Sequence, residues 1–176
     1  CAKDSGSEIQ KINLSEKKIE YCRGDRECMQ DVTTPIGRCV INDDMKEILE
    51  TFRTVDHYVM GAPVYMMHVN AIMKTFLERL YPLVRYPDEP GPPYSRRDDG
   101  KMKNAVLVVT MGAPKDWAES IAESTKDAME TILTLEGVAI TDTILGTKGQ
   151  LVPNTIEDQE ETLKKAYEAG VKLVSS

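Results

Sequence analysis

The apolar residues along this chain follow two periods in turn, one typical of strands and the other of helices. Residues 105–110 (AVLVVT) are a continuous apolar run, as expected of a central parallel strand that is covered on both faces. The other segments with a strand pattern are 8–14, 55–60 and 138–145. One segment with a helical pattern begins at Met45. The others span 71–81, 117–135 and 158–174. Strands that alternate with helices imply right-handed crossovers, a parallel sheet and an α/β fold.

Two of the predicted helices have a start signal. Asp43 or Asp44 can cap the helix that begins at Met45, and Glu47 completes a capping box with Asp44. Asn70 can cap the helix over 71–81. The residues predicted to form the apolar side of the earlier helix are Met45, Ile48, Leu49 and Phe52.

Ligands of open parallel sheets bind at the carboxyl ends of the strands, where the strand order reverses. Gly61 and Pro63 are expected to end the strand over 55–60, so the first candidate loop is 61–70. The second is 111–116, after the strand over 105–110. Both loops are therefore predicted to lie at the ligand-binding edge of the sheet.

The stretch 82–103 is long, irregular and rich in Pro, Tyr and Arg. Loops of this length are usually functional or disordered, and Tyr and Arg are common at protein interfaces. We expect this stretch to be an interface arm of a homodimer or homotetramer. A mobile, solvated loop is the alternative.

The composition fits one domain over residues 1–176, with 41% hydrophobic and 29% charged residues. The net charge of −7 disfavours nucleic acid as a partner, because phosphates attract clustered Lys and Arg. No stretch approaches the ~20 apolar residues of a membrane span, and residues 1–7 are too polar for a signal peptide. The sequence therefore predicts a cytoplasmic protein.

Two motifs in this chain resemble a known family. Residues 61–80 (GAPVYMMHVNAIMKTFLERL) contain a small residue before Pro-Val-Tyr and then a capped helix with Met-Lys-x-Phe-x-acid-Arg. Upstream, in residues 39–45 (CVINDDM), a cysteine precedes Asp-Asp-Met. These motifs resemble the NADPH-dependent FMN reductase and iron–sulfur flavoprotein families, and the resemblance covers most of the chain from Glu8 onward. It implies a flavodoxin-like, doubly wound parallel sheet with helices on both faces.

The resemblance also implies a function, that of an FMN-dependent oxidoreductase. Such a protein passes electrons from NAD(P)H to a quinone, a metal, a flavin or a similar small-molecule acceptor. The alternative is a flavodoxin-like or iron–sulfur flavoprotein electron carrier without a small-molecule substrate of its own. No catalytic residue is assigned, since hydride transfer to a flavin needs no protein general base.

The predicted FMN-binding residues come from the two candidate loops. Ala62 lets the backbone approach a flat ring, Pro63 fixes the local φ, and Tyr65 supplies apolar contact. The full set is Ala62, Pro63, Val64, Tyr65, Met66 and Asn70 in the first loop, with Thr110, Met111 and Gly112 in the second.

Three of the four cysteines, Cys22, Cys28 and Cys39, fall in one polar segment. Iron–sulfur flavoproteins have cysteines two residues apart there and a fourth further on, but here Asp25 stands in the second place. Bridged iron prefers thiolates to a carboxylate, so the sequence disfavours an iron–sulfur cluster or another metal site. A cluster held by three cysteines and Asp25 is one hypothesis. A redox-active Cys22–Cys28 disulfide and thiols without a role are the others.

The amino end differs from the family pattern. The resemblance implies a first strand, a Ser/Gly-rich phosphate loop and a helix, and residues 1–6 look like the tail of that helix. We therefore expect the first strand and the phosphate loop to precede Cys1, and weak binding of FMN is the alternative. Backbone amides of such a loop, at a helix amino end, would bind the FMN phosphate.

Overall fold

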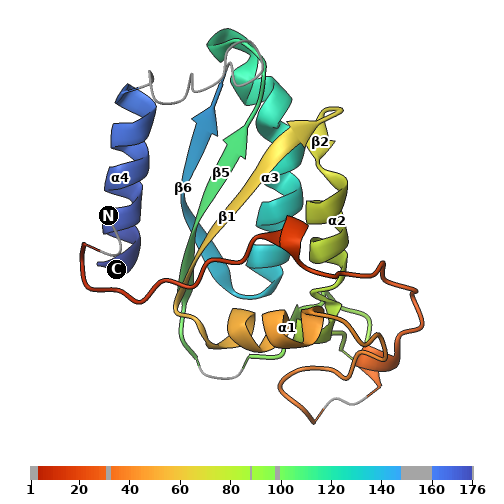
Figure 1. Ribbon diagram of the computed structural model, residues 1–176. Helices are drawn as coiled ribbons and strands as arrows, with labels where there is room; N and C mark the ends of the chain where they lie inside the picture. The colour runs from red at the N-terminus through yellow and green to blue at the C-terminus, as the bar shows by residue number, and fades with distance from the viewer. Residues whose placement is uncertain (1–3, 31–32, 88, 98–99, 148–159, 176) are drawn as a thin grey trace.

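The computed structural model describes residues 4–30, 33–87, 89–97, 100–147 and 160–175. Its centre is a sheet in the order β2-β1-β5-β6 (Figure 1). Strands β1 (His57–Tyr65), β5 (Lys103–Thr110) and β6 (Val138–Gly146) are parallel, whereas β2 (His68–Val69) pairs antiparallel with the end of β1. The predicted parallel sheet, with residues 105–110 in a central strand, is confirmed.

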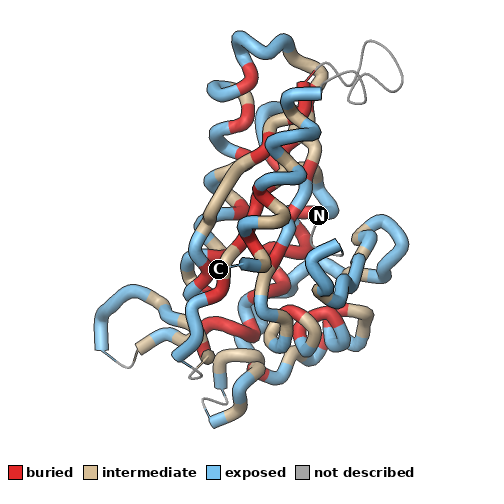
Figure 2. The backbone as a smooth tube through the Cα atoms, turned by 90° about the vertical axis from the view of Figure 1, so that its left-hand side faces the viewer, coloured by how far each residue is buried: buried red, intermediate tan, exposed pale blue. Residues whose placement is uncertain are grey.

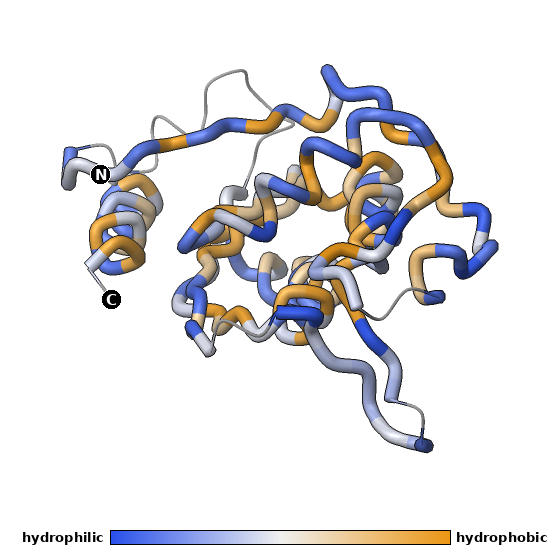
Figure 3. The backbone as a smooth tube through the Cα atoms, turned by 90° about the horizontal axis from the view of Figure 1, so that it is seen from below, coloured by the Kyte–Doolittle hydropathy of each residue, from blue (hydrophilic) through white to orange (hydrophobic). Residues whose placement is uncertain are grey.

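Helices cover both faces of this sheet. Helices α1 (Met45–Thr54), α2 (Ala71–Glu78) and α3 (Ala118–Leu135) share one core with the sheet, and α4 (Glu160–Val174) packs on the opposite face. Figure 3 shows α4 nearly end-on and apart from the other three. No helix in the described ranges is both long and apolar enough to cross a membrane.

The central strand β5 explains this division into two cores. Side chains alternate along a strand, so Leu107 and Val109 enter the larger core with α1, α2 and α3. Val106 faces the other way, into a smaller cluster with Ile144 of β6 and Leu173 of α4. Figure 2 shows the buried positions along the strands and the inner sides of the helices.

The predicted apolar side of α1 and the predicted starts of α1 and α2 are confirmed. All four residues of the predicted apolar side of α1 are buried. The Asn70 Oδ1 accepts a hydrogen bond from the Met73 N–H (3.1 Å), which caps α2. Helix α2 ends at Glu78, three residues earlier than expected, and a short 3-10 turn with Pro82 follows it.

The strand predicted over residues 8–14 is wrong. This segment is extended but pairs with none of the described strands, and it leads into a 3-10 turn over Leu14–Glu16. The Asn13 side chain accepts the Ser15 N–H (3.2 Å), which stabilises this turn. The alternating apolar residues of this segment are explained by the packing of Ile12 and Leu14 against the main core. Figure 1 shows the segment crossing the lower part of the molecule outside the sheet.

Strand β1 is longer than predicted, because Gly61 and Pro63 do not end it. Both pair in parallel register with β5, Gly61 with Val108 and Pro63 with Thr110. Among the described strands, only the two-residue β2 borders β1 on its other side. The candidate loop therefore shrinks to a tight hairpin between β1 and β2.

The predicted capping box at α1 is also wrong. The carboxylate that accepts the Met45 N–H (3.1 Å) belongs to Asp43. Asp44 instead accepts the backbone N–H of Lys18 (2.8 Å), which anchors the amino-terminal segment. Of the two neighbouring aspartates, Asp43 therefore accepts an N–H of the first turn of α1, and Asp44 binds the amino-terminal segment.

The stretch 82–103 is less irregular than predicted. It contains a small hairpin of β3 (Val84–Arg85) and β4 (Tyr94–Ser95). Arg96 is buried and donates to the backbone oxygens of Val84, Thr34 and Cys28. Because Arg96 is buried and hydrogen-bonded within its own chain, its side chain is not placed to contact a partner subunit. The homo-oligomer and the single-domain organisation stay predictions.

Candidate functional site

The two candidate loops meet at the carboxyl edge of the sheet. Pro63 at the end of β1 pairs with Thr110 at the end of β5. The next residue, Met111, donates its N–H to the Gly146 oxygen at the end of β6 (2.8 Å). Three parallel strands thus end side by side, in the position where open α/β sheets bind ligands.

The structure divides the predicted FMN-binding residues into two groups. Ala62 and Met111 are buried in the main core, and the Asn70 side chain caps α2. Tyr65 and Met66 expose 63% and 96% of their surface. The remaining residues, which are half-buried, are Pro63, Val64, Thr110 and Gly112. The exposed apolar surface of the predicted site therefore lies at the hairpin.

The tip of this hairpin has an unusual backbone. Tyr65 pairs with His68, so only Met66 and Met67 form the connection. Their φ angles are +49° and +65°, which is the left-handed region at both central positions. Type I′ hairpin turns have this feature and favour Asn-Gly, because a longer side chain is strained there. A strained turn that exposes two methionines is typical of a ligand-binding site.

We expect the double substitution Met66→Asn with Met67→Gly to stabilise the protein by about 1–2 kcal/mol, because it relieves left-handed strain. Urea unfolding measures this. Met102→Asn, at an exposed methionine outside the hairpin, is the control and should change stability by less than about 0.5 kcal/mol. An unchanged or lower stability of the double variant would show that the tip is not strained.

A groove of about 520 Å³ runs beside the outer edge of β1. It is lined by residues 10–15, by α1 and α2, and by β1 itself, including Pro63. Among the described strands, only β2 pairs with this edge of β1, at Val64 and Tyr65. The groove has the volume of a small-ligand pocket and reaches Asn70 beside the hairpin.

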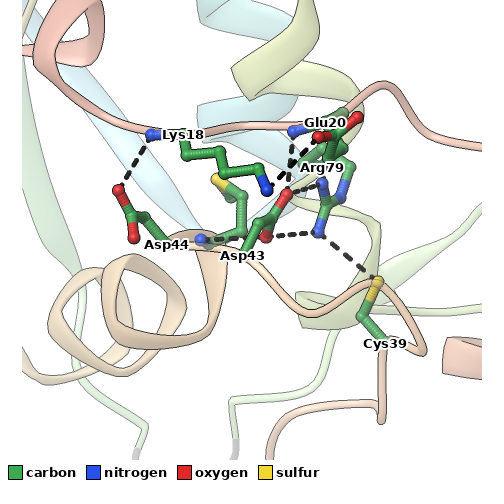
Figure 4. Close-up of polar contacts among 7 residues, drawn as sticks. Lys18, Glu20, Cys39, Asp43, Asp44 and Arg79 are labelled. Atoms are coloured by element: carbon green, nitrogen blue, oxygen red, sulfur yellow. Dashed lines mark hydrogen bonds and ion pairs between the residues drawn. The ribbon is translucent and has the colours of Figure 1, made fainter.

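The two family-like motifs meet at a buried ion pair (Figure 4). Arg79 donates through Nη1 to Asp43 Oδ2 (2.6 Å) and through Nη2 to Asp43 Oδ1 (3.0 Å). The same guanidinium donates to the Glu20 carbonyl (2.7 Å) and to the Cys39 Sγ (3.6 Å). Asp43 also accepts the Glu20 N–H (2.8 Å), so one charge pair joins α1, α2 and the amino-terminal segment.

This environment lowers the pKa of the Asp43 carboxyl. Burial acts to raise the pKa of the carboxyl, but hydrogen bonds from Arg79 and two backbone N–H groups, with the Arg79 charge, leave the pKa lowered. Asp43 therefore stays a carboxylate although its side chain is fully buried. Sequence reasoning missed this pair, although both partners stand in the two motifs.

A second pocket, of about 590 Å³, adjoins Arg79. All three thiols of the polar segment line it, together with Asp25. Burial raises the pKa of the Cys28 thiol, and the negative charges of Cys39, Cys22 and Asp25 raise it further. In the described residues, no three His, Cys, Asp or Glu side chains are placed to hold a metal ion together.

One buried acid lies outside both pockets. Glu136, at the end of α3, is 2% exposed and accepts a hydrogen bond from Ser95 Oγ (3.1 Å). Burial raises the pKa of this carboxyl to about 7, against the lowering effect of Ser95, Arg97, Lys103 and Arg96. Nothing in the local sequence predicts this burial, because Arg97 and Ser95 reach it from the distant β3–β4 segment.

Comparison with known proteins now identifies the family. The chain matches, over residues 2–171, the model of a family described by its flavodoxin-like fold. The chain belongs to this family. An iron–sulfur flavoprotein of Archaeoglobus fulgidus is 30% identical over 174 residues, which are 98% of this chain and 67% of that protein. An iron–sulfur flavoprotein of Methanosarcina thermophila is 35% identical over 79 residues, 44% of this chain and 38% of that one. The chain thus spans about two thirds of one relative and less than half of the other.

Solved structures show the same fold. An NAD(P)H:quinone oxidoreductase from Methanothermobacter marburgensis superposes with a TM-score of 0.61 at 23% identity, over 87% of this chain and 75% of that one. An FMN-dependent NADH-azoreductase from Bacillus anthracis, in complex with FMN, gives 0.55 at 16% identity, over 73% and 61%. The predicted flavodoxin-like fold is confirmed.

Proposed function

We propose that this protein is an FMN-dependent oxidoreductase that passes electrons from NAD(P)H to a small-molecule acceptor such as a quinone, a metal ion or a flavin. The observation that carries the proposal is the strained β1–β2 hairpin. It presents Tyr65, Met66 and Met67 to solvent at the carboxyl edge of a flavodoxin-like sheet. An exposed apolar tip at this edge suits a flat, largely apolar ring.

FMN, when bound, would accept a hydride and release its electrons to the acceptor. The chain's own residues would bind and orient the ring. Tyr65 and Met66 would supply apolar contact, and Pro63 and Thr110 would bring the second loop beside the first. Ala62 and Met111 would act from the core, by holding the backbone of both loops in place.

Two comparisons support this reading. The azoreductase that shares the fold is named as FMN-dependent, and the other structure as an NAD(P)H:quinone oxidoreductase.

The test is an FMN titration of protein expressed from its complete gene, followed by anaerobic addition of NADPH or NADH. We expect FMN fluorescence to change on binding and the bound flavin to be bleached by the nicotinamide. Tyr65→Ala should weaken FMN binding about tenfold, the loss of roughly one aromatic contact. Tyr21→Ala, at an exposed tyrosine outside the hairpin, is the matched control and should bind as wild type. Absence of FMN binding would reject the proposal.

The thiol-lined pocket favours a second candidate function. Three cysteines beside buried Arg79 suit an electron carrier that exchanges electrons with a protein partner. The relatives named iron–sulfur flavoprotein support this alternative. Rapid bleaching of bound FMN by NADPH alone would favour the enzyme, and reduction only by a partner protein would favour the carrier.

The assembly and the location are part of the same proposal. We propose a homodimer or homotetramer, on the basis of the half-exposed Tyr86 and Tyr94 in the stretch 82–103. The proposed location is the cytoplasm. Size-exclusion chromatography with light scattering would give the mass of the assembly. A monomer at micromolar concentration would reject the assembly.

A further inference from the structure

Glu136 is a buried acid that belongs neither to the two pockets nor to the proposed FMN site. It directly follows α3, and its side chain is 2% exposed. Glu136 Oε2 accepts one hydrogen bond, from Ser95 Oγ (3.1 Å). Glu136 Oε1 is also buried, and no donor in the described part of the chain reaches it. A buried carboxyl with an unpaired oxygen is much more stable with its proton than as an anion.

Residues 94–97, which form β4 and the two residues after it, contact Glu136 in two ways. Ser95 binds the carboxyl, and Arg97 Nη1 donates to the Glu136 backbone oxygen (3.2 Å). Ser95 Oγ also accepts the Arg97 N–H (3.0 Å), so one hydroxyl links the carboxyl to the backbone of this segment. A change in the charge of the carboxyl therefore acts directly on residues 94–97.

Three cations act on the same carboxyl. Arg96 and Arg97 follow β4, and Lys103 begins β5. Each of them donates to backbone oxygens of other residues, which fixes where its charge lies. The cations and the Ser95 hydroxyl lower the pKa of Glu136, but burial outweighs them and raises it to about 7. The backbone carbonyls at the carboxyl end of α3 also disfavour a negative charge there. Both charge states of Glu136 are therefore populated near neutral pH.

We propose that Glu136 is a pH-sensitive switch: its protonated carboxyl holds residues 94–97 against the end of α3, and its ionisation releases them. Ionisation moves one proton from the carboxyl to water, and no other covalent bond changes. The carboxylate then needs donors for both of its oxygens, and water can supply them only if residues 94–97 move away from it. The switch depends neither on FMN binding nor on assembly.

Hydrogen exchange followed by NMR in the full-length protein measures this release, with each rate divided by the intrinsic exchange rate at the same pH. The reporters are the amides of Arg96 and Arg97, which donate to the Leu83 oxygen (2.8 Å) and to Ser95 Oγ (3.0 Å). We expect their opening to become about tenfold more frequent between pH 6 and pH 8, because the carboxyl has a pKa of about 7 when covered and its ordinary value of 4.5 when released.

Two variants and one comparison within the protein make the test specific. Glu136→Gln cannot ionise, so its corrected rates should be equal at pH 6 and pH 8. Glu130→Gln, at an exposed acid of α3, is the matched control and should show the wild-type change. The amides of residues 105–110, in the centre of the sheet, should exchange more slowly than the two reporters at both pH values, because the release is local.

Each contrary result has a definite meaning. Equal corrected rates at pH 6 and pH 8 in the wild type would overturn the switch, and a tenfold change in Glu136→Gln would overturn the role of Glu136 in it. Exchange of the Arg96 and Arg97 amides only as slowly as residues 105–110 would show that the whole domain opens, which would also reject a local release.

Discussion

Arg79→Ala should destabilise the protein by about 3–5 kcal/mol, the largest effect that we expect from a single substitution. The side chains of Arg79 and Asp43 are 2% and 0% exposed, so removal of the guanidinium leaves a buried carboxylate without its cation. The Glu20 carbonyl and the Cys39 sulfur lose their donor in the same step. Urea unfolding followed by circular dichroism measures the loss.

The destabilisation by the same substitution should become smaller as the pH falls. Because the folded pKa of Asp43 is lowered, its stabilising contribution is present above the unfolded pKa and is lost as the pH falls through the folded pKa. Arg79→Ala lacks this contribution at every pH, so wild type and variant should differ most in free energy of unfolding near pH 7 and least below the folded pKa of Asp43.

Lys74→Ala is the matched control for Arg79, since Lys74 forms an exposed ion pair with Glu78 (2.9 Å) on the same helix. It should cost no more than about 0.5 kcal/mol. Arg79→Lys keeps the charge but not the paired hydrogen bonds, and should fall between the two. Equal stability of Arg79→Ala and Lys74→Ala would contradict the importance of the buried pair.

Local pattern predicted most of the fold. The apolar run at 105–110 and the periodic face of α1 each depend on neighbours in sequence, and the structure agrees with both. The segment 8–14 has a similar alternation but no strand partner among the described residues, because its apolar side chains pack on the core instead. Periodicity shows which side of a segment is buried. It does not show whether the backbone pairs.

Part of the candidate site was also predictable from local sequence pattern. The position of Thr110 follows from the end of its strand, which the pattern marks, whereas the strand before Tyr65 runs five residues further than predicted. The left-handed turn at Met66 and Met67 could not be predicted, since turn chemistry favours Asn-Gly and not Met-Met. The pair of Arg79 and Asp43 joins residues 36 apart in sequence, and only the two motifs could have suggested it.

The second large effect concerns pH. Glu136→Gln should stabilise the protein relative to wild type by about 3 kcal/mol at pH 8, and by little below pH 4.5. Burial raises the pKa of Glu136 from its ordinary value of 4.5 to about 7, and its place at the carboxyl end of α3 adds to the cost of a negative charge. Between these values the folded protein holds a proton that the unfolded chain has released. Wild-type stability therefore falls as the pH rises through this range, and glutamine, which does not titrate, removes the fall.

Unfolding in urea at several pH values between 4 and 8 measures this difference. Glu130→Gln, at an exposed acid of the same helix, is the control and should change the unfolding free energy by less than about 0.5 kcal/mol. The charges of the nearby Arg96, Arg97 and Lys103 lower the pKa of Glu136, whereas burial raises it. The experiment therefore shows which of the two effects is larger. A Glu136→Gln variant that is less stable than wild type at pH 8 would mean that the three cations prevail, and that Glu136 is a carboxylate in the folded protein.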